Sequence, residues 1–219
     1  MDLFTNGKHY RFNNEDLDNR FINEGNEGVV YRVFNEAFKI YKPYSRKTRL
    51  NEKSAEYLSK IQTDRILMPK ELIYDEINFF IGYTMPFLES YSKENIKKMK
   101  ALELKKEIEK IKVDSEILSK NNVEIFDLHL DNLIFNDKGL YIIDPGSYKI
   151  KNFDCYYLDE FNMNEINELF LKLLKFSLKL TKAKVNELQK ICSYSDITEI
   201  FKLSNEKDTV SSLVKKILS

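Results

Sequence analysis

The sequence predicts an α+β fold of two lobes, in which a small antiparallel β-sheet with one helix precedes a reduced, mainly helical lobe. The spacing of apolar residues supports this prediction, because near Ser92 it changes from the period of two typical of strands to the helical period of about 3.6. A chain of 219 residues also suits one domain built from two small lobes. We therefore expect a single domain over residues 1–219, with the first lobe at about 1–88 and the second at about 89–219.

The expected strands of the first lobe are runs of apolar and β-branched residues separated by turn residues. A tight turn at Asn35-Glu36 would join the first two strands into a hairpin. Thr48–Ile61 suits a helix, because apolar residues recur on one side of it at Ala55, Leu58 and Ile61. The expected strands are Val29–Phe34, Ala37–Tyr41, Leu72–Tyr74 and Phe79–Met85.

Helical stripes dominate the second lobe. Asn121-Asn122 ends the first long helix, and a short hairpin with a turn at residues 136–139 follows, whose second strand is Leu140–Ile143. A second long helix and a last pair of helices complete the lobe. The residues that form the two long stripes are Leu104, Ile108, Ile111 and Leu118, then Ile166, Leu169, Phe170, Leu173 and Leu174.

The composition excludes several classes of protein. Lys and Arg together number 35 and so do Asp and Glu, so the net charge is zero, which argues against a partner that is a nucleic acid. No apolar run reaches the roughly 18 residues of a membrane helix, and the first residues lack the apolar core of a secretory signal. Two cysteines cannot build a disulfide framework. We expect a cytoplasmic globular protein without a membrane partner.

Two motifs in the first lobe suit an anion. Gly25 and Gly28 lie in the turn Asn23–Gly28, and glycines let a hairpin backbone approach phosphate oxygens closely. Lys39 lies in mid-strand between apolar residues, where it faces either solvent or a bound anion. Taken alone, the first motif is better explained by an ordinary hairpin turn, and Lys39 by a side chain that extends to water.

Two polar motifs follow in the second lobe. Asp127 and Asn132 lie in a polar segment between apolar runs, where a carboxylate can accept a hydroxyl proton and an amide oxygen can bind a divalent ion. Asp144 follows an apolar strand directly and is a suitable metal carboxylate. The alternatives are a turn with Asx hydrogen bonds at the first motif and an Asp-Pro-Gly turn at the second.

The order and approximate spacing of these four motifs resemble the signature set of protein kinases. Asp127 and Asn132 match the D-x-x-x-x-N spacing of the catalytic loop, and Asp144-Pro145-Gly146 matches the D-x-G motif. The chain is thus similar to a small bacterial eukaryotic-like protein kinase, over about Phe21 to Gly146. This resemblance implies a bilobal protein-kinase-like fold and an ATP- and Mg²⁺-dependent phosphotransferase with a hydroxyl acceptor.

The resemblance also implies a nucleotide site. Lys39 would hold the α- and β-phosphates, and either Glu52 or Glu56 of the helix would pair with it; the sequence leaves the choice between the two glutamates open. The backbone at Pro86 and Leu88 would contact the adenine edge. The remaining residues implied to bind ATP are Gly25 and Gly28 over the phosphates, and Val30, Ala37, Met85 and Ile134 around the adenine.

For the chemistry, the resemblance implies Asp127 as the catalytic base and Asn132 and Asp144 as ligands of Mg²⁺. His129 stands where protein kinases usually have a lysine that contacts the γ-phosphate, and it suits that role and a structural role equally.

Several positions depart from the kinase pattern. Asn23 replaces the first glycine, Ile125-Phe126 replaces His-Arg before the base, and Pro145 replaces the phenylalanine of Asp-Phe-Gly. The short C-terminal part leaves little room for the helices on which protein substrates dock. We expect a Ser/Thr protein kinase, with a small-molecule kinase of the same superfamily and a pseudokinase that only binds ATP as the alternatives.

Overall fold

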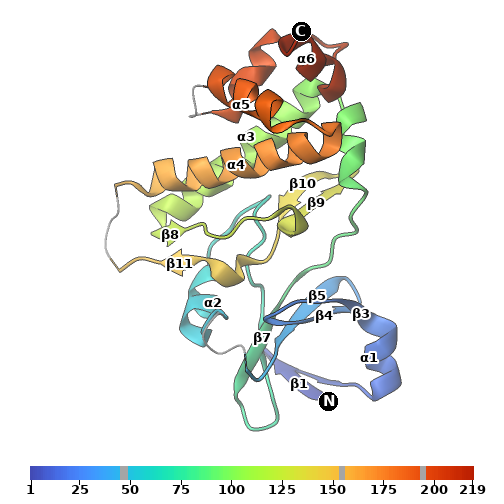
Figure 1. The fold of residues 1–219 in the computed structure, drawn as a ribbon. Helices are drawn as coiled ribbons and strands as arrows, with labels where there is room; N and C mark the ends of the chain where they lie inside the picture. Colours follow the sequence, from blue (N-terminus) through green and yellow to red (C-terminus); the bar gives the residue numbers. More distant parts are fainter. Residues whose placement is uncertain (45–48, 153–155, 193–195) are drawn as a thin grey trace. The chain divides into compact units, whose positions relative to one another are not determined.

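A curled antiparallel sheet of seven strands dominates the first part of the fold (Figure 1). We describe a computed structural model, which covers residues 1–44, 49–152, 156–192 and 196–219. The order of strands is β2-β1-β6-β7-β5-β4-β3, and every neighbouring pair is antiparallel. The strands are β1 (Asp2–Thr5), β2 (Lys8–Arg11), β3 (Phe21–Glu24), β4 (Gly28–Val33), β5 (Glu36–Tyr41), β6 (Leu72–Tyr74) and β7 (Phe80–Pro86).

The chain divides into two compact units, and neither is a continuous stretch of sequence. The first unit comprises Met1–Thr63, Leu67–Leu88 and Asp144–Tyr148, and the second comprises Asp64–Ile66, Glu89–Ile143 and Lys149–Ser219. The α+β class with an antiparallel sheet and a helical part is as predicted.

The first 20 residues contain elements that the sequence did not predict. Strands β1 and β2 extend the sheet, and α1 (Asn14–Arg20) follows them. Asn13 begins α1 with a reciprocal cap, because its side chain accepts from the N–H of Asp16 while the Asp16 side chain accepts from the N–H of Asn13. This short helix buries none of its own residues, so it lacks the apolar stripe by which a helix is recognised.

Several predicted boundaries differ from the structure, and two of these differences have a physical reason. The turn between β4 and β5 is Phe34-Asn35 and not Asn35-Glu36, because Phe34 takes the left-handed conformation with φ 56°. The helix α2 (Glu52–Leu58) is shorter than the predicted Thr48–Ile61, and Asn51 begins it by accepting from the N–H of Ser54. Thr48 itself lies outside the described residues.

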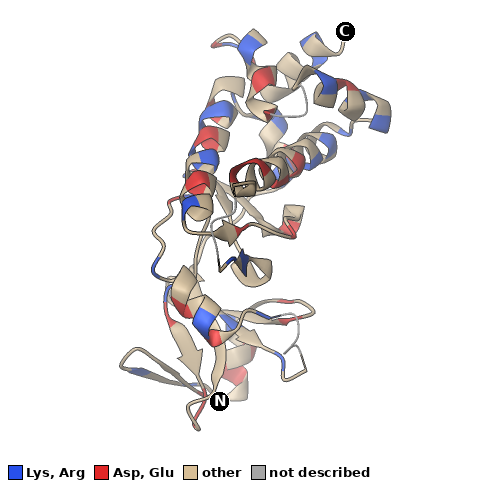
Figure 2. Cartoon of the chain, turned by 90° about the vertical axis from the view of Figure 1, so that its left-hand side faces the viewer, with Lys and Arg blue, Asp and Glu red and all other residues tan. Residues whose placement is uncertain are grey.

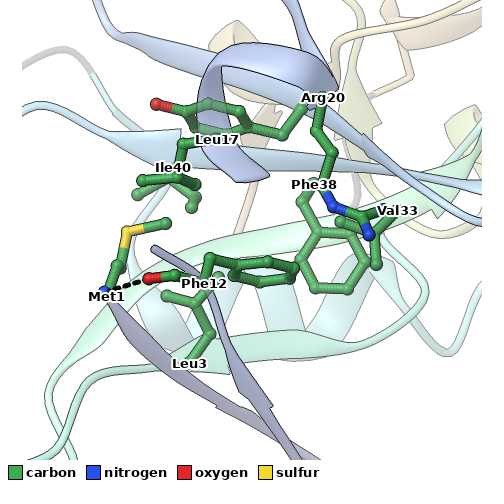
Figure 3. Close-up of a pocket in the computed structure, with 9 residues that line it drawn as sticks. Met1, Leu3, Phe12, Leu17, Arg20, Val33, Phe38 and Ile40 are labelled. Carbon is green, nitrogen blue, oxygen red and sulfur yellow. Dashed lines mark hydrogen bonds between the residues drawn. The ribbon is translucent and has the colours of Figure 1, made fainter. Parts of the chain in front are cut away.

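One face of the sheet forms an apolar core together with α1 and its flanks. Leu3, Phe12, Val33, Phe38 and Ile73 are buried there, and the ring of Tyr10 meets that of Phe38 edge to face. Figure 3 shows a crevice within this core, and the space left between its side chains is too small for a water molecule. We therefore regard the crevice as part of the core. Its lining residues are Met1, Leu3, Phe12, Leu17, Arg20, Tyr31, Val33, Phe38 and Ile40.

Long helices form most of the second unit. The four residues of the first predicted stripe are all buried in α3, and the five of the second stripe are all buried in α4, as predicted. Charges of both signs alternate along the helices (Figure 2). Within the described ranges, no helix combines the length and the apolar composition that crossing a bilayer requires. The α-helices are α3 (Ala101–Lys120), α4 (Leu158–Leu178), α5 (Lys182–Ile191) and α6 (Val210–Ile217), and the 3₁₀ turns are η1 (Lys93–Lys98), η2 (Leu130–Asn132) and η4 (Ile197–Leu203).

Two small antiparallel pairs flank the polar segment of the second unit. They are β9 (Leu133–Asn136) with β10 (Gly139–Ile142), and β8 (Val123–Glu124) with β11 (Lys149–Ile150). The buried amide of Asn162 in α4 holds the segment that leads to Asp127. It accepts from the N–H of Ile125 at 2.7 Å and donates to the carbonyl of Val123 at 2.8 Å. The helix α4 therefore fixes the start of the polar segment.

Candidate functional site

The pairing of β4, β5 and β7 places several residues that were predicted to bind the nucleotide on one face of the sheet. Val30 pairs with Lys39, and Lys39 pairs with Tyr83. Ala37 and Met85 form the next pair on this face, since residues two apart along a strand point to the same side. All except Val30 are buried. This site face is opposite to the apolar core, because Phe38, the neighbour of Lys39, faces that core.

Lys39 is a buried cation held by two carboxylates. Its residue is 5% exposed, and its ammonium donates to Oε2 of Glu27 at 3.2 Å and to Oδ1 of Asp144. A buried ammonium needs such partners, because an unpaired charge away from water is costly. The chain thus brings together two predicted residues, Lys39 and Asp144, that lie 105 positions apart.

The predicted glutamate partner of Lys39 is wrong in this structure. Glu52 accepts from the hydroxyl of Tyr74 at 3.0 Å, and Glu56 pairs with Lys60 one helical turn away at 2.8 Å. Both glutamates are on exposed positions of α2. Glu27, in the turn between the two glycines, takes the place that we expected for one of them.

Asp144 is fixed by its backbone and by three donors. Its φ of 65° is in the left-handed region, which Asp adopts more readily than most residues, and it begins the 3₁₀ turn η3 (Pro145–Ser147). Oδ1 accepts from Lys39, from the Tyr83 hydroxyl at 3.1 Å and from the Gly146 N–H at 3.3 Å. Among the described residues no donor contacts Oδ2. This second carboxylate oxygen suits a divalent cation such as Mg²⁺, which prefers oxygen ligands.

Buried tyrosine hydroxyls surround the same carboxylate. Burial, with the negative charge of Asp144 as the next cause, raises the pKa values of Tyr41, Tyr83 and Tyr148. Tyr83 donates to Asp144, whereas the hydroxyl of Tyr148 is buried without a hydrogen-bond partner in the part of the chain that the structure describes. Buried hydroxyls without partners are uncommon, so this donor fits a site that takes up a polar ligand or water.

The three glycines of the site differ in what they do. A Cβ on Gly28 would lie 2.5 Å from the carbonyl oxygen of Ile40, so this glycine permits the close approach of β4 and β5. Nothing lies within 4 Å of a Cβ placed on Gly25. A Cβ on Gly146 would lie 2.9 Å from Oε2 of Glu27, 3.1 Å from Oδ1 of Asp144 and 3.2 Å from Nζ of Lys39. Gly146 therefore leaves room beside the charged cluster.

The segment that follows β7 has backbone groups available for a ligand. Pro86 pairs with Glu36, and the N–H of Phe87 donates to the carbonyl of Asn35 at 2.9 Å. The N–H of Leu88 donates to no group within the described ranges. Leu88 was the predicted donor to the adenine edge, and its N–H is free for that contact.

The second unit holds the predicted base in a separate cluster. Asp127 has φ 63°, and its Oδ1 lies 2.6 Å from Nε2 of His129. Asn132 accepts from the N–H of His129 at 3.2 Å and donates to the carbonyl of Ile143 at 3.5 Å. Side chains of Asp127 and His129 are 49% and 61% exposed, so both groups can meet a molecule from solvent.

Ile134 lies on the exposed side of the hairpin β9–β10. It pairs with Tyr141, and both are half-buried, whereas Leu133 and Ile142 on the other side are fully buried. The structure thus places Ile134 where an apolar ring can pack on it, within the second unit.

Among the described residues no three His, Cys, Asp or Glu side chains gather as a metal site. The predicted metal ligands are one carboxylate, Asp144 in the first unit, and one amide, Asn132 in the second.

No model of a protein family matches the sequence, and no curated protein is significantly similar to it.

Proposed function

We propose that the protein is an ATP- and Mg²⁺-dependent phosphotransferase of protein-kinase-like fold that transfers the γ-phosphate to a hydroxyl group. The contact between Lys39 and Asp144 carries the proposal, because a buried cation and a carboxylate with a free oxygen suit a phosphate and its metal ion. The resemblance to protein kinases implies that Lys39 binds the phosphates and that Asp144 binds Mg²⁺.

The site face supports a nucleotide as the donor. Val30, Ala37 and Met85 give it an apolar lining next to Lys39, as a purine ring requires. The free N–H of Leu88 is available to the edge of the base. The buried hydroxyl of Tyr148 adds a donor near the charged groups.

The exposed cluster of the second unit supports a hydroxyl acceptor. Asp127 would orient the hydroxyl and accept its proton, and His129, hydrogen-bonded to it, would hold the carboxylate in place. Asn132 and Asp144 would bind Mg²⁺, which neutralises the developing charge on the phosphate oxygens. We favour a Ser/Thr protein as the acceptor and the cytoplasm as the location, with a small hydroxyl compound as the alternative acceptor.

The proposal is tested by following labelled phosphate from ATP in the presence of Mg²⁺, with the protein alone, with Ser/Thr peptides and with small hydroxyl compounds. Asp127→Ala should lower transfer at least 100-fold, while ATP affinity stays within about threefold, since the base contacts the acceptor and not the nucleotide.

Asp131→Asn is the matched control, because Asp131 is an exposed aspartate of the same segment without a proposed role. It should leave transfer unchanged. Full transfer by Asp127→Ala would contradict the assignment of the base. ATP binding by the wild type without transfer to any acceptor would favour the pseudokinase alternative.

A further inference from the structure

Glu27 is the one charged group of the Lys39 cluster that has no part in the proposed chemistry. Its carboxylate is 22% exposed and lies in the turn between β3 and β4. The backbone of this turn is fixed, since the N–H of Gly25 donates to the carbonyl of Gly28 and the N–H of Lys42 donates to that of Glu27. The side chain of Glu27 is therefore the part that can move away from Lys39.

The charge of the cluster opposes an incoming phosphate. Lys39 contributes one positive charge, and Glu27 and Asp144 contribute two negative charges beside it. An ammonium has three donors, and two of them are directed at these carboxylates. A phosphate that reaches Lys39 thus meets a cluster of net negative charge.

The space in front of the ammonium is also narrow. The position that a Cβ on Gly146 would take lies about equally close to Glu27, Asp144 and Lys39, at 2.9 to 3.2 Å. Three charged atoms therefore border one small volume. A phosphate oxygen can enter it only if Glu27 moves aside, and a cation that accompanies the phosphate lowers the repulsion from the two carboxylates.

We propose that Glu27 makes this site selective for the metal-complexed nucleotide, by competing as a tethered anion with phosphate for Lys39. The inference rests on the proposed function. A nucleotide that carries a divalent cation is less negatively charged than the free nucleotide, so it is repelled less by Glu27. A nucleotide or polyphosphate without a bound cation experiences the full repulsion from the carboxylate of Glu27.

The test is calorimetric binding of ATP and of inorganic tripolyphosphate, each with and without Mg²⁺, to the full chain. Glu27→Gln keeps the shape of the side chain and removes its charge. It should bind both metal-free ligands about tenfold more tightly than the wild type, which corresponds to about 1.4 kcal/mol. The gain in affinity on adding Mg²⁺ should shrink by a similar factor. Glu27→Ala also removes the carboxylate and should behave in the same way.

Glu24→Gln is the matched control, since Glu24 carries the same charge in the neighbouring strand but pairs with Lys42. It should change each affinity less than twofold. Equal or weaker binding by Glu27→Gln, or an equal gain by Glu24→Gln, would overturn the inference.

The two ligands separate this inference from the proposed function. Suppose that Glu27→Gln binds tripolyphosphate more tightly than the wild type does, and that neither the wild type nor this variant binds ATP better than tripolyphosphate. The inference that Glu27 competes with phosphate is then supported, and the proposed nucleotide function is contradicted. If neither ligand binds to any variant, both fail, because Lys39 is then not an anion site.

Discussion

Replacing Lys39 by Met should destabilise the fold by leaving two carboxylates without their cation. Met keeps most of the volume of the lysine stem on the apolar site face, so the change is mainly the loss of charge. At 3.2 Å from Glu27 and an effective dielectric constant of about 20, one pair of charges attracts by about 5 kcal/mol before desolvation is counted.

The net loss of folding stability in Lys39→Met is smaller than this attraction. Breaking a fully buried ion pair costs about 3–5 kcal/mol. Here Glu27 and Asp144 are 22% and 36% exposed, whereas the Lys39 side chain is 6% exposed. Water can solvate the carboxylates once the ammonium is gone, so we expect Lys39→Met to lower the free energy of unfolding by about 2 kcal/mol.

Urea unfolding followed by far-ultraviolet circular dichroism measures this loss, since the sequence contains no tryptophan for fluorescence. Adding Glu27→Gln to Lys39→Met should restore about 1 kcal/mol, because it removes one of the two unpaired charges. If Lys39→Met is as stable as the wild type or more stable, the cost of desolvating the cluster exceeds its attraction. In that case the reasoning from buried charge is refuted.

Two further predictions use matched pairs of variants, and thermal unfolding measures both. Tyr83→Phe should lower the free energy of unfolding by about 1.5 kcal/mol, because a buried hydroxyl that donates to a carboxylate is lost. Tyr148→Phe removes an unpartnered hydroxyl and should be neutral or stabilising. A larger loss of stability in Tyr148→Phe than in Tyr83→Phe would contradict the assigned hydrogen-bond partners. Gly28→Ala should cost about 2 kcal/mol or more, because its Cβ would lie 2.5 Å from a backbone oxygen. Gly25→Ala should change stability by less than about 0.5 kcal/mol, and equal losses at both glycines would argue against the close approach of the strands.

Apolar periodicity predicted most of the fold because it reports burial directly. The stripes of α3 and α4 follow from it, and the hairpin of β4 and β5 was also predicted, whereas the pairing of β5 with β7 was not. Elements without an apolar pattern were missed, as α1 shows. The turn between β4 and β5 was misplaced by one residue, because the left-handed conformation of Phe34 has no signal in its residue type.

The site was predicted in part. Lys39 and Asp144 were expected at one site because of their place in the order of motifs, and the structure brings them together. The carboxylate partner of Lys39 was missed, because spacing along α2 favoured Glu52 or Glu56 and gives no information on the direction of side chains. The register of β4 and β5 places Glu27 opposite Lys42, so the contact of its side chain with Lys39 could not be predicted from strand pairing either.

The way in which the chain alternates between the units has a consequence for its synthesis. The five residues Asp144–Tyr148 belong to the first unit, although the chain has by then completed β10 of the second. When residues 1–88 have left the ribosome, the ammonium of Lys39 therefore still lacks its partner Asp144, which has not yet been synthesised. The first unit is completed only after nearly half of the remaining chain has been made, and a fragment that ends at Leu88 would lack Asp144 permanently. The first unit is thus a late product of translation, although its strands are the first to be made.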